Sequence, residues 1–301
     1  MARYSRFYLG RVIKLGGATS ELLMKVIESA PVISVRGTRY TFTDFKLFGD
    51  RTHPNGVFAK LTKYRPEGSV EVLKHDEHRV GSEAVADLIE ASSEFVYIPE
   101  LSGIAYRHVW NSIQREAFER IFSELFWASD LALMSKCEIR PIVDIRAFVH
   151  RLANVDLITE LRATVNPPNP LFAPCWKSLF DYVRKRKLQE LAVSEKSEAG
   201  IDSRLQAVAN QVAAPAENSE SACELMEPLL GGIGDAAVLM AADGYGTAKV
   251  VGYERSKRVV FKTSENQKSF EMPSAFAPEE LYSTAYDELR EVSSARWMEH
   301  G

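Results

Sequence analysis

The spacing of apolar residues changes several times along the chain, and each change predicts a new element. Over the first eighty residues, aromatic and β-branched residues form runs that are separated by Gly, Pro and Asn. This pattern is typical of strands joined by turns. One exception is residues 20–29, where apolar side chains recur on one helical face and Ser20 is the expected cap. We expect strands at residues 4–15, 32–35, 40–47, 57–64 and 70–73.

Helical spacing returns before residue 130. Residues 112–127 carry apolar side chains three and four positions apart, which is typical of an amphipathic helix on a sheet. We also predict a helix at residues 82–91 and a pair of strands at 95–98 and 104–108.

A second unit begins near residue 131. Three prolines within residues 166–170 exclude both a helix and a sheet ladder there, so this segment is expected to be a rigid extended corner. Residues 194–234 are rich in Ser, Ala, Glu and Asn and are expected to be a flexible acidic segment. The other expected elements are strands at 137–145, 157–165, 236–242, 248–253 and 259–263 and helices at 146–152, 174–192 and 279–298.

These elements predict an α+β fold made of two mixed sheet-plus-helix units, with mainly antiparallel strands and a long C-terminal helix. We expect an N-terminal α+β domain at residues 1–130 and a C-terminal α+β domain at residues 131–301, which contains the flexible segment at 194–234.

The net charge of the 301 residues is −4, but opposite charges are separated along the chain. Residues 1–80 have a net charge of +6 and residues 136–188 of +5, whereas residues 81–135 have −6 and residues 189–245 have −8. A block of one sign acts as a local field even in a mildly acidic protein. The total charge therefore does not exclude a nucleic-acid partner.

Several classes of protein are excluded or disfavoured by composition. No apolar run reaches the roughly 20 residues of a membrane helix, and we expect no membrane insertion. The first residues carry Arg3, Arg6 and Arg11 instead of the apolar core of a signal peptide. The three cysteines are widely spaced, as in a reducing compartment. We expect a cytoplasmic protein without a cofactor.

Motifs for catalysis are weak. His75 and His78 flank two carboxylates, but no third His or Cys is near, so we assign no metal site. No nucleophile-elbow pattern occurs, and we assign no catalytic residue. A loose carboxylate pair with a lysine, formed by Asp243, Glu254 and Lys257, leaves open a metal-dependent nuclease.

Clusters of Lys and Arg are the stronger signal, because consecutive cations on one surface contact successive phosphates. The densest run lies at residues 184–187, and Lys249, Lys262 and Lys268 of the last strands extend the basic surface. The nucleic-acid-binding candidates are Arg3, Arg6, Lys60, Lys63, Arg65, Lys177, Arg184, Lys185, Arg186, Lys187, Lys257 and Arg258.

Short segments also carry a resemblance to a known family. Residues 94–99 (Glu-Phe-Val-Tyr-Ile-Pro) and 103–107 (Gly-Ile-Ala-Tyr-Arg) precede a helix, Ile139-Arg140-Pro141 and the strand with its proline-rich corner at 161–170. With the basic helix and the final strands, this order resembles phage-exclusion proteins of the RexA type and bacterial anti-phage defence proteins of similar size. The resemblance implies sequence-nonspecific DNA binding by a homodimer that signals to a partner effector, with Lys177, Arg184, Arg186 and Lys187 in the basic helix.

Three functions follow as hypotheses. The first is an anti-phage defence protein without enzymatic activity, which binds nucleic acid through phosphate contacts as a homodimer and acts as sensor or regulator for an effector. The second is the metal-dependent nuclease. The third is a protein-interaction module that recognises a partner or phage protein through its acidic segment.

Overall fold

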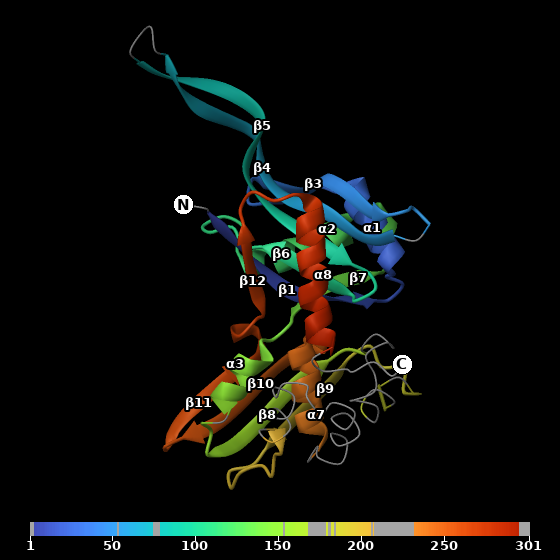
Figure 1. The fold of residues 1–301 in the computed structure, drawn as a ribbon, viewed down its shortest axis with the longest axis vertical. Helices are drawn as coiled ribbons and strands as arrows, with labels where there is room; N and C mark the ends of the chain where they lie inside the picture. Colours follow the sequence, from blue (N-terminus) through green and yellow to red (C-terminus); the bar gives the residue numbers. More distant parts are fainter. Residues whose placement is uncertain are drawn as a thin grey trace.

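The computed structural model describes residues 3–52, 54–74, 79–152, 154–167, 179, 182–183, 185–205, 207 and 232–294. Two antiparallel sheets organise this part of the chain (Figure 1). The first has eight strands in the order β12-β1-β6-β5-β4-β3-β2, with β7 also paired to β1. The second has four strands in the order β11-β10-β8-β9. The predicted α+β class with mainly antiparallel strands is confirmed.

The eight-stranded sheet is built mostly from the first half of the chain. Its strands are β1 (Tyr4–Leu15), β2 (Ile33–Val35), β3 (Thr38–Gly49), β4 (Pro54–Lys74), β5 (Arg79–Ile98), β6 (Gly103–Arg107), β7 (Lys136–Pro141) and β12 (Ser269–Pro273).

One face of this sheet is covered by α1 (Ser20–Ser29) and α2 (Arg115–Ala128). Phe118 and Phe122 of α2 pack edge to face on Phe95 of β5, with ring centroids 5.7 Å apart in both pairs. Such pairs add to the hydrophobic stabilisation of a core. The cap of α1 is Thr19, whose hydroxyl accepts from the Leu22 amide, and not the predicted Ser20.

The other face of the sheet is covered in part by α8 (Pro278–Ser294), the predicted long C-terminal helix. Leu281, Ala285 and Leu289 of α8 are fully buried. Gly103 of β6 permits this close approach, because a Cβ atom there would lie 2.5 Å from the Leu289 side chain. β7, β12 and α8 all come after residue 130 in the chain, yet they belong to the eight-stranded sheet or pack on it. The two sheets therefore do not divide the chain at residue 130 as expected.

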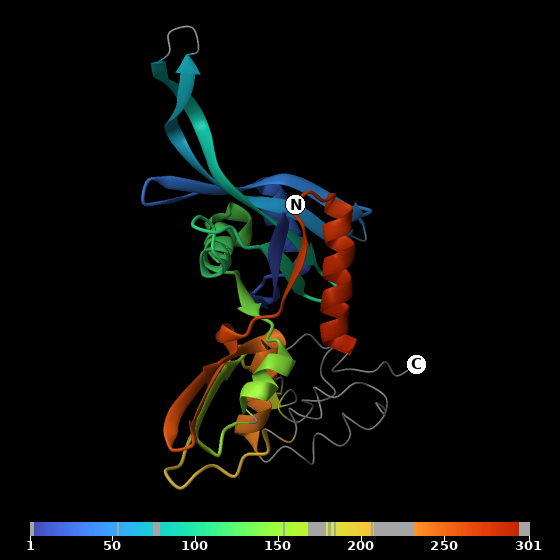
Figure 2. The same cartoon turned by 60° about the vertical axis from the view of Figure 1, so that its left-hand side comes forward.

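A two-stranded arm extends from the eight-stranded sheet, where β4 and β5 continue beyond β3 (Figure 2). The helix predicted at 82–91 is wrong, because these residues pair with β4 from Ser82↔Glu71 to Ala91↔Lys63. Asp87 has a left-handed φ of 51°, which a continuous α-helix does not tolerate. Cross-strand pairing has overridden the local helical preference of this segment.

The four-stranded sheet contains β8 (Leu157–Val165), β9 (Leu191–Lys196), β10 (Gly246–Glu254) and β11 (Lys257–Lys262). Two helices, α3 (Ile145–Leu152) and α7 (Ile233–Met240), pack on one side of it. Figure 2 shows both helices on the same side of β8, β10 and β11, with no described helix or strand on the opposite side. Short turns of 3-10 helix at Asp130–Ala132 and Thr263–Glu265 and a π-helical turn at Ala241–Tyr245 complete the described elements.

Two predictions for the second half are wrong. Residues 236–242 form α7 and the π-helical turn instead of a strand, because a short run that is buried on all sides has no periodicity to separate strand from helix. The helix predicted at 174–192 does not reach its expected end, since residues 191–196 form β9.

Some predictions fall outside the described residues. These are most of the proline-rich corner, the first part of the helix predicted at 174–192, most of the segment at 194–234, and the His75–His78 motif. Within the described part of the chain, no helix is long and apolar enough to cross a membrane.

Candidate nucleic-acid interface

The four-stranded sheet has one apolar face and one polar face, which follow from the alternation of side chains along each strand. Val250 of β10 lies opposite Phe261 of β11 and Leu161 of β8, and all three are buried beneath the helices. Residues one position away point to the uncovered side. We call this side the open face. Its charged and aromatic residues are Arg162 and Glu160 of β8, Lys196 of β9, Lys249 and Tyr253 of β10, and Arg258 and Lys262 of β11, and the apolar pair Val251 and Val260 lies among them.

Three cations form one row across the open face. Lys249 lies directly opposite Lys262 on one side and directly opposite Arg162 on the other. Side chains in such cross-strand pairs have Cβ atoms about 4.5–5.5 Å apart, and like charges in this position destabilise a sheet. The row therefore concentrates positive charge at an energetic cost to the fold.

A single carboxylate lies beside this row. Glu160 Oε1 is 2.7 Å from Arg162 Nε and 3.5 Å from Lys249 Nζ. The Glu160 side chain is only 11% exposed, so it neutralises part of the row from below and presents little negative charge to solvent. It also lies opposite Lys196 of β9.

Lys262, Arg258 and Lys196 are exposed and form no ion pair within the part of the chain that the structure describes. The open face thus holds five cations and one carboxylate. Such a surface attracts polyanions, and its field is not cancelled by the acidic total charge.

Tyr253 adds an aromatic ring to the open face. It lies opposite Arg258 across the β10–β11 hairpin and is 38% exposed. Nucleic-acid bases stack on exposed aromatic rings of a sheet, while neighbouring cations contact the phosphates. Charge and aromatic surface therefore occur together on the same face.

The predicted binding residues of the eight-stranded sheet are paired with carboxylates. Arg6 lies 2.6 Å from Glu271, and Lys63 and Arg65 both contact Glu90, Lys63 at 2.8 Å. The hydrogen bond from Lys63 lowers the pKa of the Glu90 carboxyl, so this carboxylate stays ionised at neutral pH and offsets one of the two positive charges beside it.

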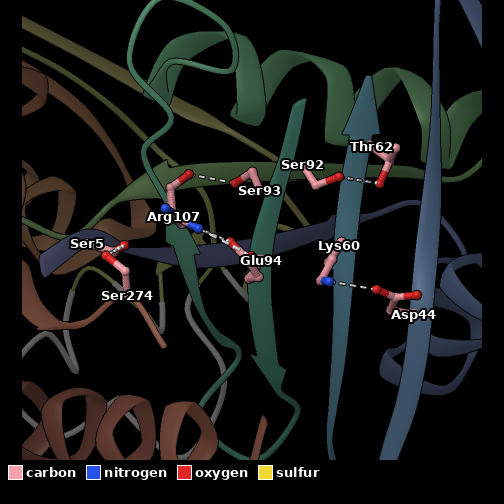
Figure 3. Close-up of polar contacts among 9 residues, drawn as sticks. All are labelled: Ser5, Asp44, Lys60, Thr62, Ser92, Ser93, Glu94, Arg107 and Ser274. Atoms are coloured by element: carbon pink, nitrogen blue, oxygen red, sulfur yellow. Dashed lines mark hydrogen bonds and ion pairs between the residues drawn. The ribbon is translucent and has the colours of Figure 1, made fainter. Parts of the chain in front are cut away.

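Lys60 is neutralised in a similar way (Figure 3). Its amino group is 2.7 Å from Asp44 of β3, and it lies opposite Glu94 of β5, which pairs at 3.0 Å with Arg107 of β6. Charges of alternating sign cross four strands in this row. Its pattern is opposite to that of the open face, where three cations are neighbours.

The other predicted residues do not share one surface. Lys185, Arg186 and Lys187 are exposed and precede β9, and Arg186 lies over the Tyr182 ring at 5.5 Å. Arg258 lies at the diagonally opposite corner of the four-stranded sheet, and Lys257, one position earlier, points to the other face. Arg3 is exposed near the start of β1, while Lys177 and Arg184 lie outside the described residues.

The alternative nuclease site is not assembled. Asp243 is buried in the π-helical turn before β10, whereas Glu254 and Lys257 lie at the far end of that strand. The nine residues of β10 follow the turn that holds Asp243, and the two ends of this strand are about 26 Å apart at roughly 3.3 Å per residue. Among the described residues, no group of three or more His, Cys, Asp or Glu side chains is arranged to hold a metal ion.

The sequence predicted the basic contribution of Lys249 and Lys262 but missed Arg162 and Lys196. Arg162 alternates with the buried Leu161 and Ala163, a signal that places it on the polar face of its strand. Lys196 falls in the segment expected to be flexible, and no pattern pointed to its strand.

Comparison with known proteins assigns the chain to a family. Residues 20–219 match the model described as "Domain of unknown function (DUF4747)". The chain belongs to the DUF4747 family. The matched region of this DUF4747 protein includes β8 and β9, while β10 and β11 of the open face lie beyond it. A search of curated proteins found no match.

Proposed function

We propose that this DUF4747 protein binds single-stranded nucleic acid without sequence preference through the open face of its four-stranded sheet. The row of Lys262, Lys249 and Arg162 is the observation that carries the proposal. Three directly opposed cations weaken the sheet in isolation, and phosphates bound along the row relieve their repulsion.

Tyr253 favours a single strand over a duplex. Its ring is accessible beside Arg258, and only unpaired bases expose the flat surface that stacks on it. Sequence preference is not expected, because phosphate contacts and stacking act on every nucleotide.

The biological setting of this binding comes from the resemblance to RexA-type proteins. We propose an anti-phage defence role in the cytoplasm, with a homodimer that passes the binding signal to an effector protein. This part of the proposal rests on the resemblance alone and is separable from the binding activity.

Fluorescence polarisation of a labelled single strand and of its duplex, at about 50 mM salt, tests the binding. The double variant Lys249→Glu, Lys262→Glu is expected to abolish binding. A control with the same change in net charge, Lys25→Glu with Lys136→Glu, alters exposed lysines of the other half and is expected to retain it.

Circular dichroism establishes that both double variants are folded. Equal affinity of the open-face variant and the control would overturn the proposal, as would absence of binding by the unmodified protein at low salt. Equal affinity for single strand and duplex would remove the stacking role of Tyr253.

A further inference from the structure

A cavity of about 400 Å³ lies between β1 of the eight-stranded sheet and the segments that flank the four-stranded sheet. Its volume falls within the range of small-molecule sites. The walls combine apolar and polar groups, and the residues that matter here are Lys14, Ser102, Asn166, Leu188 and Gln189. The cavity is therefore formed by residues from both halves of the fold.

Lys14 supplies a positive charge to this cavity without a neighbouring carboxylate. Its Nζ lies 3.1 Å from Ser20 Oγ, 3.1 Å from Ser102 Oγ and 3.3 Å from the Tyr97 hydroxyl. No Asp or Glu among the described residues lies within ion-pair distance of it. Among the described residues, every direct polar partner of the amino group is a hydroxyl.

Cys137 does not supply the missing negative charge. It lies opposite Lys14 across the β1–β7 pair and is buried. Burial raises the pKa of its thiol to about 12, so the sulfur stays protonated and neutral at physiological pH. Burial also lowers the pKa of Lys14, as expected for a cation that has lost solvent without gaining a counterion.

Asn166 contributes a hydrogen-bond acceptor, whereas the amino group of Lys14 is a donor. It follows directly after β8, lines the same cavity and is only 2% exposed. Its Nδ2 donates to the Gln189 carbonyl at 3.0 Å, which fixes the orientation of the amide. Its Oδ1 is buried and has no hydrogen-bond partner in the described part of the chain. A buried acceptor of this kind requires a donor.

We propose that this cavity binds a small organic anion that also carries an N–H or O–H group. The carboxylate or phosphate of the ligand contacts Lys14 and the hydroxyl of Ser102, and its donor satisfies Asn166 Oδ1. The apolar part of the ligand packs against Leu188. Because the binding residues come from both halves, occupancy links the two sheets.

Acetylation of lysines by acetic anhydride, followed by peptide mass mapping, tests the proposal on the unmodified protein. The probes are inorganic phosphate in one arm and glycolate in the other, at constant ionic strength set with chloride. We expect saturable protection of Lys14 in at least one arm, reaching about tenfold slower acetylation when the probe is near ten times its Kd. Lys25 is the internal control, because it is exposed on α1 and paired with Glu21.

The two arms separate a phosphate ligand from a carboxylate ligand. Unchanged acetylation of Lys14 in both arms, or equal protection of Lys14 and Lys25, would overturn the proposal. The open-face variant Lys249→Glu, Lys262→Glu is expected to keep the protection, so this result is independent of nucleic-acid binding.

Thermal unfolding provides a second readout. The protecting probe is expected to raise the Tm of the unmodified protein and of Lys25→Gln, but not the Tm of Lys14→Gln or Asn166→Ala. If both cavity variants respond like Lys25→Gln, the anion binds elsewhere and the assignment is wrong. If the cavity variants do not fold, the acetylation result still decides.

Discussion

Lys249 of β10 and Lys262 of β11 face each other directly across the uncovered side of the four-stranded sheet. Lys249 has a second cation, Arg162, on its other side, and Glu160 lies closer to that pair than to Lys262. The position of Lys262 therefore adds repulsion that no described carboxylate offsets. We therefore expect Lys262 to lower the stability of the fold while it strengthens nucleic-acid binding.

Replacing Lys262 with Thr is expected to stabilise the fold and weaken nucleic-acid binding. Removal of the opposed charge should raise the free energy of unfolding by about 0.2–1 kcal/mol at low salt. For a single strand, the slope of log K against log salt should become shallower by about 0.7. Urea unfolding and polarisation titrations measure the two effects. Reduced stability with unchanged binding would contradict this account of Lys262.

Tyr253 is expected to act through its ring and not through its hydroxyl. Tyr253→Ala should weaken binding of a single strand by about 1–3 kcal/mol, the usual effect of losing one stacked base. Tyr253→Phe keeps the ring and should bind within about twofold of the unmodified protein. Polarisation at one salt concentration suffices for the comparison. Equal losses in both variants would assign the effect to the hydroxyl.

The buried thiol of Cys137 gives stability a specific dependence on alkaline pH. Its pKa is raised from 9.0 to about 12 by burial, so above pH 9 the unfolded chain releases this proton first. The folded chain then binds more protons, and the free energy of unfolding falls as pH rises.

Relative to Cys137→Ala, the unmodified protein should lose about 2 kcal/mol between neutral pH and about pH 10.5. Urea unfolding of both proteins across this range measures the difference, and most other titrations cancel in the comparison. Parallel pH profiles would mean that burial does not raise the pKa of this thiol above its value in the unfolded chain.

The arm formed by β4 and β5 is expected to contribute little to the stability of the rest of the fold. None of residues 66–71 and 80–87 belongs to either buried core. Replacing residues 66–87 with Asn-Gly should therefore leave Tm within about 3 °C of its original value. This dipeptide joins Arg65 and Leu88, which are already paired, through a tight hairpin turn.

Phe122→Ala provides the matched control for the shortened arm. Phe122 is fully buried between α2 and the sheet, and its truncation should cost about 3–5 kcal/mol. A loss of Tm in the shortened protein as large as that of Phe122→Ala would show that the arm supports the body of the fold.

The elements with strong periodicity were predictable from the sequence. The strands at 4–15 and 157–165 and the helix at 20–29 match β1, β8 and α1 along their whole lengths. Each has a clear apolar pattern and ends at turn residues or at a proline-rich stretch. The strand at 82–91 and the helix at 236–242 lacked such a pattern, because pairing with β4 and complete burial decide their structure.

The binding surface was harder to predict from the sequence than the fold. Alternation in β8 indicates that Arg162 and Leu161 point to opposite sides, but it does not say which side remains uncovered. That depends on α3 and α7, and α7 was predicted as a strand. The pairing of Lys60 with Asp44 and of Lys63 with Glu90 depends on sheet register, which a list of basic residues does not contain.

Photocrosslinking of a thiouridine-substituted single strand at low salt, with mass mapping of the crosslinked peptides, tests the central claim most directly. The proposal predicts crosslinks in the peptides of β10 and β11, including Tyr253, and their loss in the variant Lys249→Glu, Lys262→Glu. Crosslinks confined to the eight-stranded sheet or to residues 185–187, and unaffected by that variant, would contradict binding at the open face.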